Sequence, residues 1–123
     1  MAEADTILIA VRDGVLADSL QFSLEVEGFD TRFCDEHSLC ALMSAPTACL
    51  VLDEDVFLRV AEEGRAALLS GHRTPVILMT PDAKTRVLAH AERRGITVLE
   101  TPILGGVLFD AIRQAIEKKV FSG

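Results

Sequence analysis

Two polar side chains stand directly behind apolar runs of the sequence, at positions from which they could act on a phosphate. Asp53 follows the apolar run at residues 48–52, and Thr80 follows the run at residues 75–79. A carboxylate can accept a phosphoryl group, and a hydroxyl can donate a hydrogen bond to a phosphate oxygen. If the two runs are neighbouring parallel strands, these side chains meet at the carboxyl edge of one sheet, where such folds bind ligands.

Further polar residues follow the same runs or the ends of two others, and they would line the site or supply a countercharge. They are Arg12, Asp13, Glu54, Asp55 and Thr101. For Glu54 and Asp55 the alternative explanation is a solvated acidic loop. For Thr80 the alternative is that its hydroxyl caps the helix that follows. The position of Asp53 at the end of a buried strand favours a site there.

The runs that carry these residues are predicted to be five β-strands separated by segments of helix length. They cover residues 6–11, 30–34, 48–52, 75–79 and 96–99. This alternation is typical of a parallel sheet covered by helices. The first, third and fourth runs are apolar at almost every position, as strands buried on both faces must be. The second and fifth contain polar residues, so we expect them nearer the edges.

Five helices are predicted between and after the strands. The first four cover residues 15–27, 37–44, 58–70 and 83–94, and the last has apolar residues on one face from Leu108 to Ile116. Gly28 is expected to end the first helix. No linker or repeat interrupts the pattern, so residues 1–123 are predicted to form one domain. Its fold class is α/β, a doubly wound five-stranded parallel sheet of order 2-1-3-4-5, flavodoxin-like, with five helices.

Composition excludes several classes of partner. The 123 residues contain 12 Lys and Arg against 19 Asp and Glu, so the net charge is 12 − 19 = −7. An anion of this size repels nucleic acids and anionic membranes. The acidic N-terminus does not resemble a secretory signal, and no apolar run is long enough to span a bilayer. We therefore expect a cytoplasmic protein that contacts neither nucleic acid nor membrane.

The sequence resembles the receiver domain of bacterial two-component response regulators over essentially its whole length. The matching segments are residues 7–16, 19–29, 50–53, 74–80 and 94–102. The resemblance implies that Asp53 accepts a phosphoryl group from a sensor histidine kinase and that Thr80 hydrogen-bonds this group and moves with it. The segment at 74–80 looks especially like regulators whose receivers precede a helix-turn-helix DNA-binding domain.

The sequence departs from the family at the positions that carry its chemistry. The family holds Mg²⁺ with two adjacent acids after the first strand, and here these positions are Val11 and Arg12, with only Asp13 acidic. The family's lysine is replaced by Thr101, and its aromatic residue on the fifth strand by Val98. The fold is therefore expected without the usual site.

Loss of the metal ligands weighs against ordinary phosphorylation. Mg²⁺ prefers carboxylate oxygens, which valine and arginine cannot supply. Only Asp13, Asp53 and Asp55 would be left to hold a cation, so we expect no metal or other cofactor. We hypothesise instead that the Arg12 guanidinium pairs with Asp53 and holds the domain in one state without phosphorylation.

A contact surface is predicted on the last helix, next to the fifth strand. Its residues are Val98, Phe109, Ile116 and Val120, the last three at the spacing i, i+7, i+11. An exposed apolar patch at this place would bind a partner or form a homodimer. The alternative is that these residues widen the face of the helix that packs on the core.

Three functions remain open at this stage, and the first is favoured. It is a non-enzymatic signalling module, an atypical receiver that acts by contact with a kinase or another signalling protein. The second is a conventional receiver that is phosphorylated on Asp53 and controls a DNA-binding output domain. The third is a flavodoxin-like cofactor binder, although the chain has no Trp or Tyr and no Ser/Thr-rich phosphate loop after the first strand.

Overall fold

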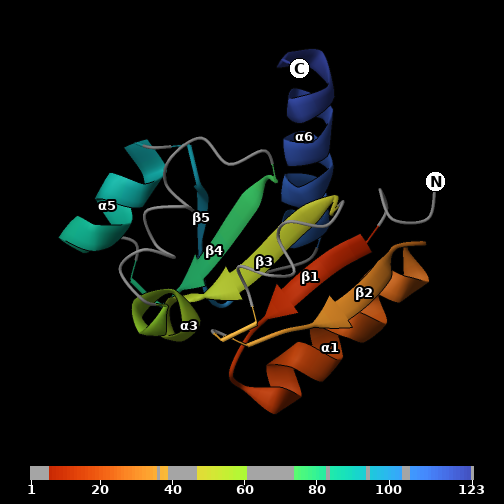
Figure 1. Ribbon diagram of the computed structural model, residues 1–123, viewed down its shortest axis with the longest axis horizontal. Coiled ribbons are helices and arrows are strands. Elements are labelled where there is room, and N and C mark those ends of the chain that lie inside the picture. Colours follow the sequence, from red (N-terminus) through yellow and green to blue (C-terminus); the bar gives the residue numbers. More distant parts are fainter. Residues whose placement is uncertain are drawn as a thin grey trace.

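The computed structural model describes residues 6–35, 37–38, 47–60, 74–82, 84–93, 95–103 and 106–122, with backbone alone for 86–88, 91 and 118–122. Strands and helices alternate along these segments (Figure 1). In chain order they are β1 (Thr6–Ala10), α1 (Gly14–Val26), β2 (Asp30–Phe33), β3 (Cys49–Asp53), α3 (Glu54–Arg59), β4 (Val76–Thr80), α5 (Arg86–Arg93), β5 (Thr97–Glu100) and α6 (Val107–Ser122).

The five strands form one parallel sheet in the order β2-β1-β3-β4-β5, which confirms the predicted fold class. Figure 1 shows β2 and β5 at the two edges, as the polar residues in their sequences predicted. The three inner strands are buried at nearly every position, whereas β2 and β5 are largely exposed. Burial on both faces explains why the inner strands are apolar without alternation.

Helices cover both faces of the sheet and divide its core into two layers. Successive residues of a strand point to opposite faces, so Ile9 and Leu8 belong to different layers. The layer of Ile9 includes Leu24 of α1 and Ile112 of α6. The layer of Leu8 includes Phe57 of α3, which is 1% exposed. The sheet is thus packed from both sides, and its carboxyl edge is left for polar residues.

The first helix lies within one residue of the predicted range 15–27 at each end. Asp13 is its N-cap, since Oδ1 accepts hydrogen bonds from the N–H groups of Val15 and Leu16 at 3.0 and 3.2 Å. Beyond its C-terminus Gly28 adopts a φ of +96°, a left-handed conformation that glycine takes without strain. The predicted role of Gly28 is confirmed.

The structure shows a short helix, α3, before the helix expected at residues 58–70; α3 overlaps that range only at 58–59 and ends at Arg59, with Val60 in an extended conformation. In the structure α3 starts at Glu54, directly after β3, because the Asp53 side chain accepts the Val56 N–H and caps the helix. Residues 61–70 lie outside the described part of the chain, as does most of the helix expected at 37–44. The predicted number of five helices therefore stays a prediction.

Strands β3 and β4 each extend one residue further than predicted, so Asp53 and Thr80 are the last residues of the strands themselves. Of the helices that the structure describes, none is long and apolar enough to cross a membrane.

Candidate functional site

Asp53 and Thr80 lie side by side at the carboxyl edge of the sheet. Strands β3 and β4 pair in parallel with Asp53 opposite Met79, so Thr80 follows one position beyond. On the other side of β3, Ala10 is opposite Leu52, which brings the segment after β1 to the same edge. The topology thus brings the residues at the ends of β1, β3 and β4 to one edge of the sheet, as expected for this strand order.

The carboxylate of Asp53 is held by two backbone N–H groups. Its Oδ1 accepts a hydrogen bond from the Val56 N–H at 2.9 Å, and its Oδ2 accepts one from the Arg12 N–H at 3.1 Å. The side chain is half-buried at the start of α3. Both oxygens therefore already accept hydrogen bonds from the backbone: Oδ1 caps α3, and Oδ2 binds the segment after β1.

The ion pair of Arg12 differs from the one hypothesised. Its Nε lies 3.1 Å from Oδ2 of Asp55, whereas Asp53 is contacted by the backbone N–H of Arg12. Asp55 also pairs with Arg59, whose Nε lies 3.2 Å from its Oδ1. All three side chains are about half exposed, so the charges stay hydrated and the cost of burying a guanidinium beside Asp53 is avoided.

The hydroxyl of Thr80 is buried and bound within the chain. Thr80 is 0% exposed, and its Oγ1 lies 3.2 Å from Oε1 of Glu54 and 3.3 Å from the carbonyl oxygen of Asp82, both of which can accept its proton. The same Oγ1 accepts the Asp82 N–H at 3.1 Å. Because these contacts are to Glu54 of α3 and to Asp82 in the turn after β4, while α5 begins only at Arg86, capping of α5 does not explain Thr80.

The acids of this edge do not fit a Mg²⁺ site. Mg²⁺ needs free carboxylate oxygens in a near-octahedral arrangement. Asp13 caps α1, Asp53 binds two N–H groups, and Asp55 pairs with two arginines. Across the described part of the chain, no three or more His, Cys, Asp or Glu side chains are grouped so as to hold a metal ion.

Thr101 and Val98 lie on the β5 side of the site. The N–H of Thr101 donates a 2.8 Å hydrogen bond to the carbonyl oxygen of Thr80, and its peptide bond to Pro102 is cis. Val98 is half-buried and packs against the core layer that contains Leu8. Thr101 is therefore part of the site through its backbone, and Val98 supports the sheet beneath it.

The contact surface predicted on the last helix is only partly exposed. The Phe109 ring packs edge-on against Phe29, with centroids 5.8 Å apart and planes at 63°, and the Arg113 guanidinium lies 5.5 Å from its centre. Ile116 is half-buried against the core layer of α1 and α6. Phe109 and Ile116 therefore favour the alternative that these residues widen the face of the helix that packs on the core. The side chain of Val120 lies outside the described residues.

An exposed apolar stripe, which sequence reasoning did not single out, lies instead on α1. Val15, Phe22 and Val26 are 82%, 71% and 68% exposed. They repeat the spacing i, i+7, i+11, so they share one side of the helix, away from its buried residues Ala17 and Leu24. The spacing was detectable in the sequence, but the core-facing leucines of the same helix masked it.

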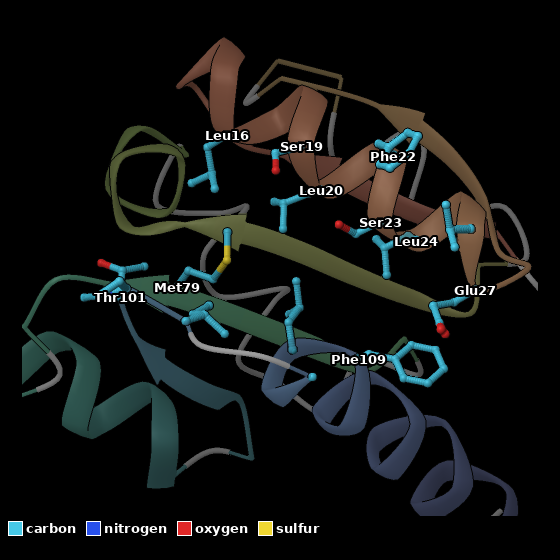
Figure 2. Close-up of a pocket in the computed structure, with 15 residues that line it drawn as sticks. Leu16, Ser19, Leu20, Phe22, Ser23, Leu24, Glu27, Met79, Thr101 and Phe109 are labelled. Carbon is cyan, nitrogen blue, oxygen red and sulfur yellow. The ribbon is translucent and has the colours of Figure 1, made fainter.

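A groove of about 700 Å³ runs beside α1 toward the segment that leads into α6. Figure 2 shows Leu20 and Leu24 on its α1 side, Met79 and Thr101 toward one end, and Phe109 on the opposite side. Its lining is mostly apolar. The groove therefore connects the backbone of the candidate site with the surface of α1.

The fold is similar to that of solved receiver domains. The CheY-like response regulator receiver domain of Methanospirillum hungatei JF-1 superposes with a TM-score of 0.79 at 19% identity, over 97% of this chain and 98% of that one. The signal receiver domain of a modulated diguanylate cyclase from Desulfovibrio desulfuricans G20 gives 0.70 at 23%, over 96% and 98%. Full-length FixJ of B. japonicum gives 0.77 at 24%, over 94% of this chain and 59% of that one.

At the level of sequence, no protein-family model and no curated protein matches the chain. Since all three structural relatives are less than 25% identical, the comparisons establish the fold. The chain has the fold of response-regulator receiver domains, and the resemblance drawn from its motifs is confirmed to that extent.

Proposed function

We propose that the chain is a receiver module of a two-component signalling system that acts by protein contact, with little or no Mg²⁺-dependent phosphorylation. The observation that supports this proposal is that the acids of the site are already bound by other groups of the chain. Asp13, Asp53 and Asp55 all lie at the expected edge of the sheet, but each is engaged by the chain's own N–H groups or arginines. A module of this kind is not an enzyme, and we place it in the cytoplasm.

Electrostatics explains why such a site transfers phosphoryl groups poorly. Proteins catalyse this transfer mainly by positioning the groups and neutralising charge on the phosphoryl oxygens. The Arg12 guanidinium contacts Asp55, and among the described residues no group of three or more His, Cys, Asp or Glu side chains is placed to hold a metal ion. A phosphoryl group on Asp53 would add negative charge to an already acidic edge.

The test is to incubate the protein with a small acyl phosphate and Mg²⁺ and to record the intact mass. In the reaction tested, an Asp53 carboxylate oxygen attacks phosphorus, and the bond from phosphorus to the donor's carboxylate oxygen breaks with its electron pair on that oxygen. We expect little or no added mass in the wild type and none in Asp53→Asn. A stoichiometric phosphoryl group that is lost in Asp53→Asn would favour the alternative, a conventional receiver that controls a DNA-binding output domain.

The proposed partner contact involves the stripe of Val15, Phe22 and Val26. Asp18 and Glu25 flank this stripe, and α1 contains no Lys or Arg. A second copy of the chain would place acids against acids, whereas a partner helix with basic residues beside its apolar face would complement the stripe. We therefore propose a signalling protein as the partner, such as a sensor histidine kinase, rather than a homodimer.

Light scattering over a range of concentrations distinguishes these two occupants. We expect a monomer throughout, and the same result for Phe22→Glu. A dimer that forms in the wild type and is lost in Phe22→Glu would assign the stripe to a second copy instead.

A further inference from the structure

The side chain of Glu54 contacts the hydroxyl of Thr80, and this contact is not needed to cap α3. It follows Asp53 directly, and its Oε1 lies 3.2 Å from the buried hydroxyl of Thr80. The first turn of α3 is already capped by Asp53, which binds the Val56 N–H. The carboxylate of Glu54 is half-buried and points across from β3 to the end of β4.

The single proton that the Thr80 hydroxyl can donate is already engaged in this arrangement. A hydroxyl has a single proton to donate, and the two acceptors within reach of Thr80 are Glu54 Oε1 and the carbonyl oxygen of Asp82. Its oxygen already accepts the Asp82 N–H. With 0% of the residue exposed, water does not supply an alternative partner from outside. A new acceptor would have to compete with Glu54 and with the Asp82 carbonyl oxygen for this proton.

A group on Asp53 would lie near the carboxylate of Glu54, because Glu54 follows Asp53 directly and contacts Thr80 on the neighbouring strand. Asp53 and Thr80 end neighbouring strands, so a phosphoryl group on Asp53 would lie close to Thr80, and the resemblance to receiver domains implies a hydrogen bond from the Thr80 hydroxyl to it. Such a group carries up to about two negative charges and would face the Glu54 carboxylate at close range. Repulsion between the two negative groups and their competition for the Thr80 proton both disfavour a phosphoryl group on Asp53 while Glu54 stays in place.

We propose that Glu54 is an internal competitor for Thr80, a carboxylate that takes the hydrogen bond a phosphoryl group on Asp53 would need. This inference rests on the proposed function and names how its site is regulated. In the resting chain Glu54 holds Thr80 at the buried end of β4. Thr80 is thereby tied to an acid of the chain itself rather than to the phosphorylation state of Asp53.

Asp55 provides a matched control for Glu54. The two acids are adjacent, both lie in the first turn of α3, and both carry the same charge. Asp55 contacts Arg12 and Arg59, whereas Glu54 contacts Thr80. Asp55→Asn therefore removes a charge from the same edge without removing an acceptor from Thr80.

The first measurement uses the full chain without metal or phosphodonor. Nuclear magnetic resonance follows the Thr80 methyl group and the Asp82 amide in wild type, Glu54→Ala, Glu54→Gln and Asp55→Asn. We expect Glu54→Ala to shift both signals, Glu54→Gln to restore most of the wild-type position because its amide oxygen still accepts, and Asp55→Asn to leave them in place. If the Thr80 methyl and Asp82 amide signals shift by the same amount in Glu54→Ala and in Asp55→Asn, the inference is overturned.

The second measurement compares initial rates of phosphoryl uptake from a small acyl phosphate by intact mass. We expect a rate about tenfold above wild type in Glu54→Ala, the effect of about one hydrogen bond to a charged group, and a smaller change in Asp55→Asn. A Glu54→Ala rate no greater than that of wild type or of Asp55→Asn overturns the competition. Stoichiometric uptake by wild type itself would instead overturn the proposed function, while the ratio of rates still decides the role of Glu54.

Discussion

The bodies of β3 and β4 and the residues that end these strands are built on different principles. The bodies are aliphatic, fully buried and packed by helices from both faces. The ends, Asp53 and Thr80, are polar and are fixed by individual hydrogen bonds to Arg12, Val56 and Glu54. Dispersed packing therefore holds the bodies of the strands, whereas a few single contacts hold their ends.

Truncation within the strand bodies should have the largest effect on stability. Leu78 is 0% exposed in the layer that contains Phe57. Leu78→Ala is expected to lower the free energy of unfolding by about 3 to 5 kcal/mol, because it removes buried methyl groups and leaves a cavity. Denaturant unfolding followed by circular dichroism measures the loss. Leu78→Met, which nearly conserves volume, should cost less than about 1.5 kcal/mol. Equal losses for the two variants would contradict a closely packed core.

Removing the side chain of Asp53 should have a smaller effect. Asp53→Ala takes away the cap of α3 and the acceptor for the Arg12 N–H, and a lost cap typically costs about 1 kcal/mol. Asp53→Asn keeps one oxygen, which can accept one of these two bonds, so it should lie between Asp53→Ala and the wild type in the same unfolding experiment. A loss in Asp53→Ala as large as that in Leu78→Ala would break the distinction between body and end.

The same distinction explains how far the sequence could predict the fold. Strand order, edge strands and the end of α1 at Gly28 all follow from patterns with a physical period or a special backbone conformation. Runs such as residues 48–52 can be buried on both faces only in an inner strand. The short helix α3 was not predicted, because its capping side chain, Asp53, had been assigned to the site alone.

The contacts at the strand ends were predictable only in part. The positions of Asp53 and Thr80 follow from the topology, and both lie at the expected edge. The partners of Arg12 and Thr80 do not, because two acids one residue apart differ in direction by about 100° on a helix. Sequence alone could not decide that Asp55 meets Arg12 while Glu54 meets Thr80.

The ion pair of Arg12 should contribute least among the contacts of the strand ends. Both partners are about half exposed, and such pairs typically stabilise a protein by about 0 to 1 kcal/mol. Arg12→Ala is expected to stay within this range, because the backbone N–H that binds Asp53 is retained. Unfolding of Arg12→Ala and wild type at low and high salt checks the expectation, since screening should bring the two closer together. A loss above about 2 kcal/mol would show that the Arg12 side chain does more than this pair.

Within the body of β3, a titratable group should be silent at neutral pH. Burial raises the pKa of the Cys49 thiol to about 12 from an ordinary value of 9.0, and burial together with the nearby charge of Asp35 raises the pKa of Cys34 to about 11. The folded protein therefore keeps these protons longer than the unfolded chain does. The free energy of unfolding should not respond to either thiol below about pH 9 and should fall as the pH rises from 9 toward 12.

Alkylation provides the measurement for these thiols, because the thiolate is the nucleophile. At pH 8, Cys49 in the folded protein should react about a thousandfold more slowly than in urea, as a thiolate fraction lowered by three pKa units requires. Peptide mapping by mass spectrometry separates Cys49 and Cys34 from Cys40. If Cys49 reacted as fast in the folded as in the unfolded protein, β3 would open to solvent far more often than a strand packed by helices on both faces allows. The contrast between the bodies and the ends of the strands would then be wrong.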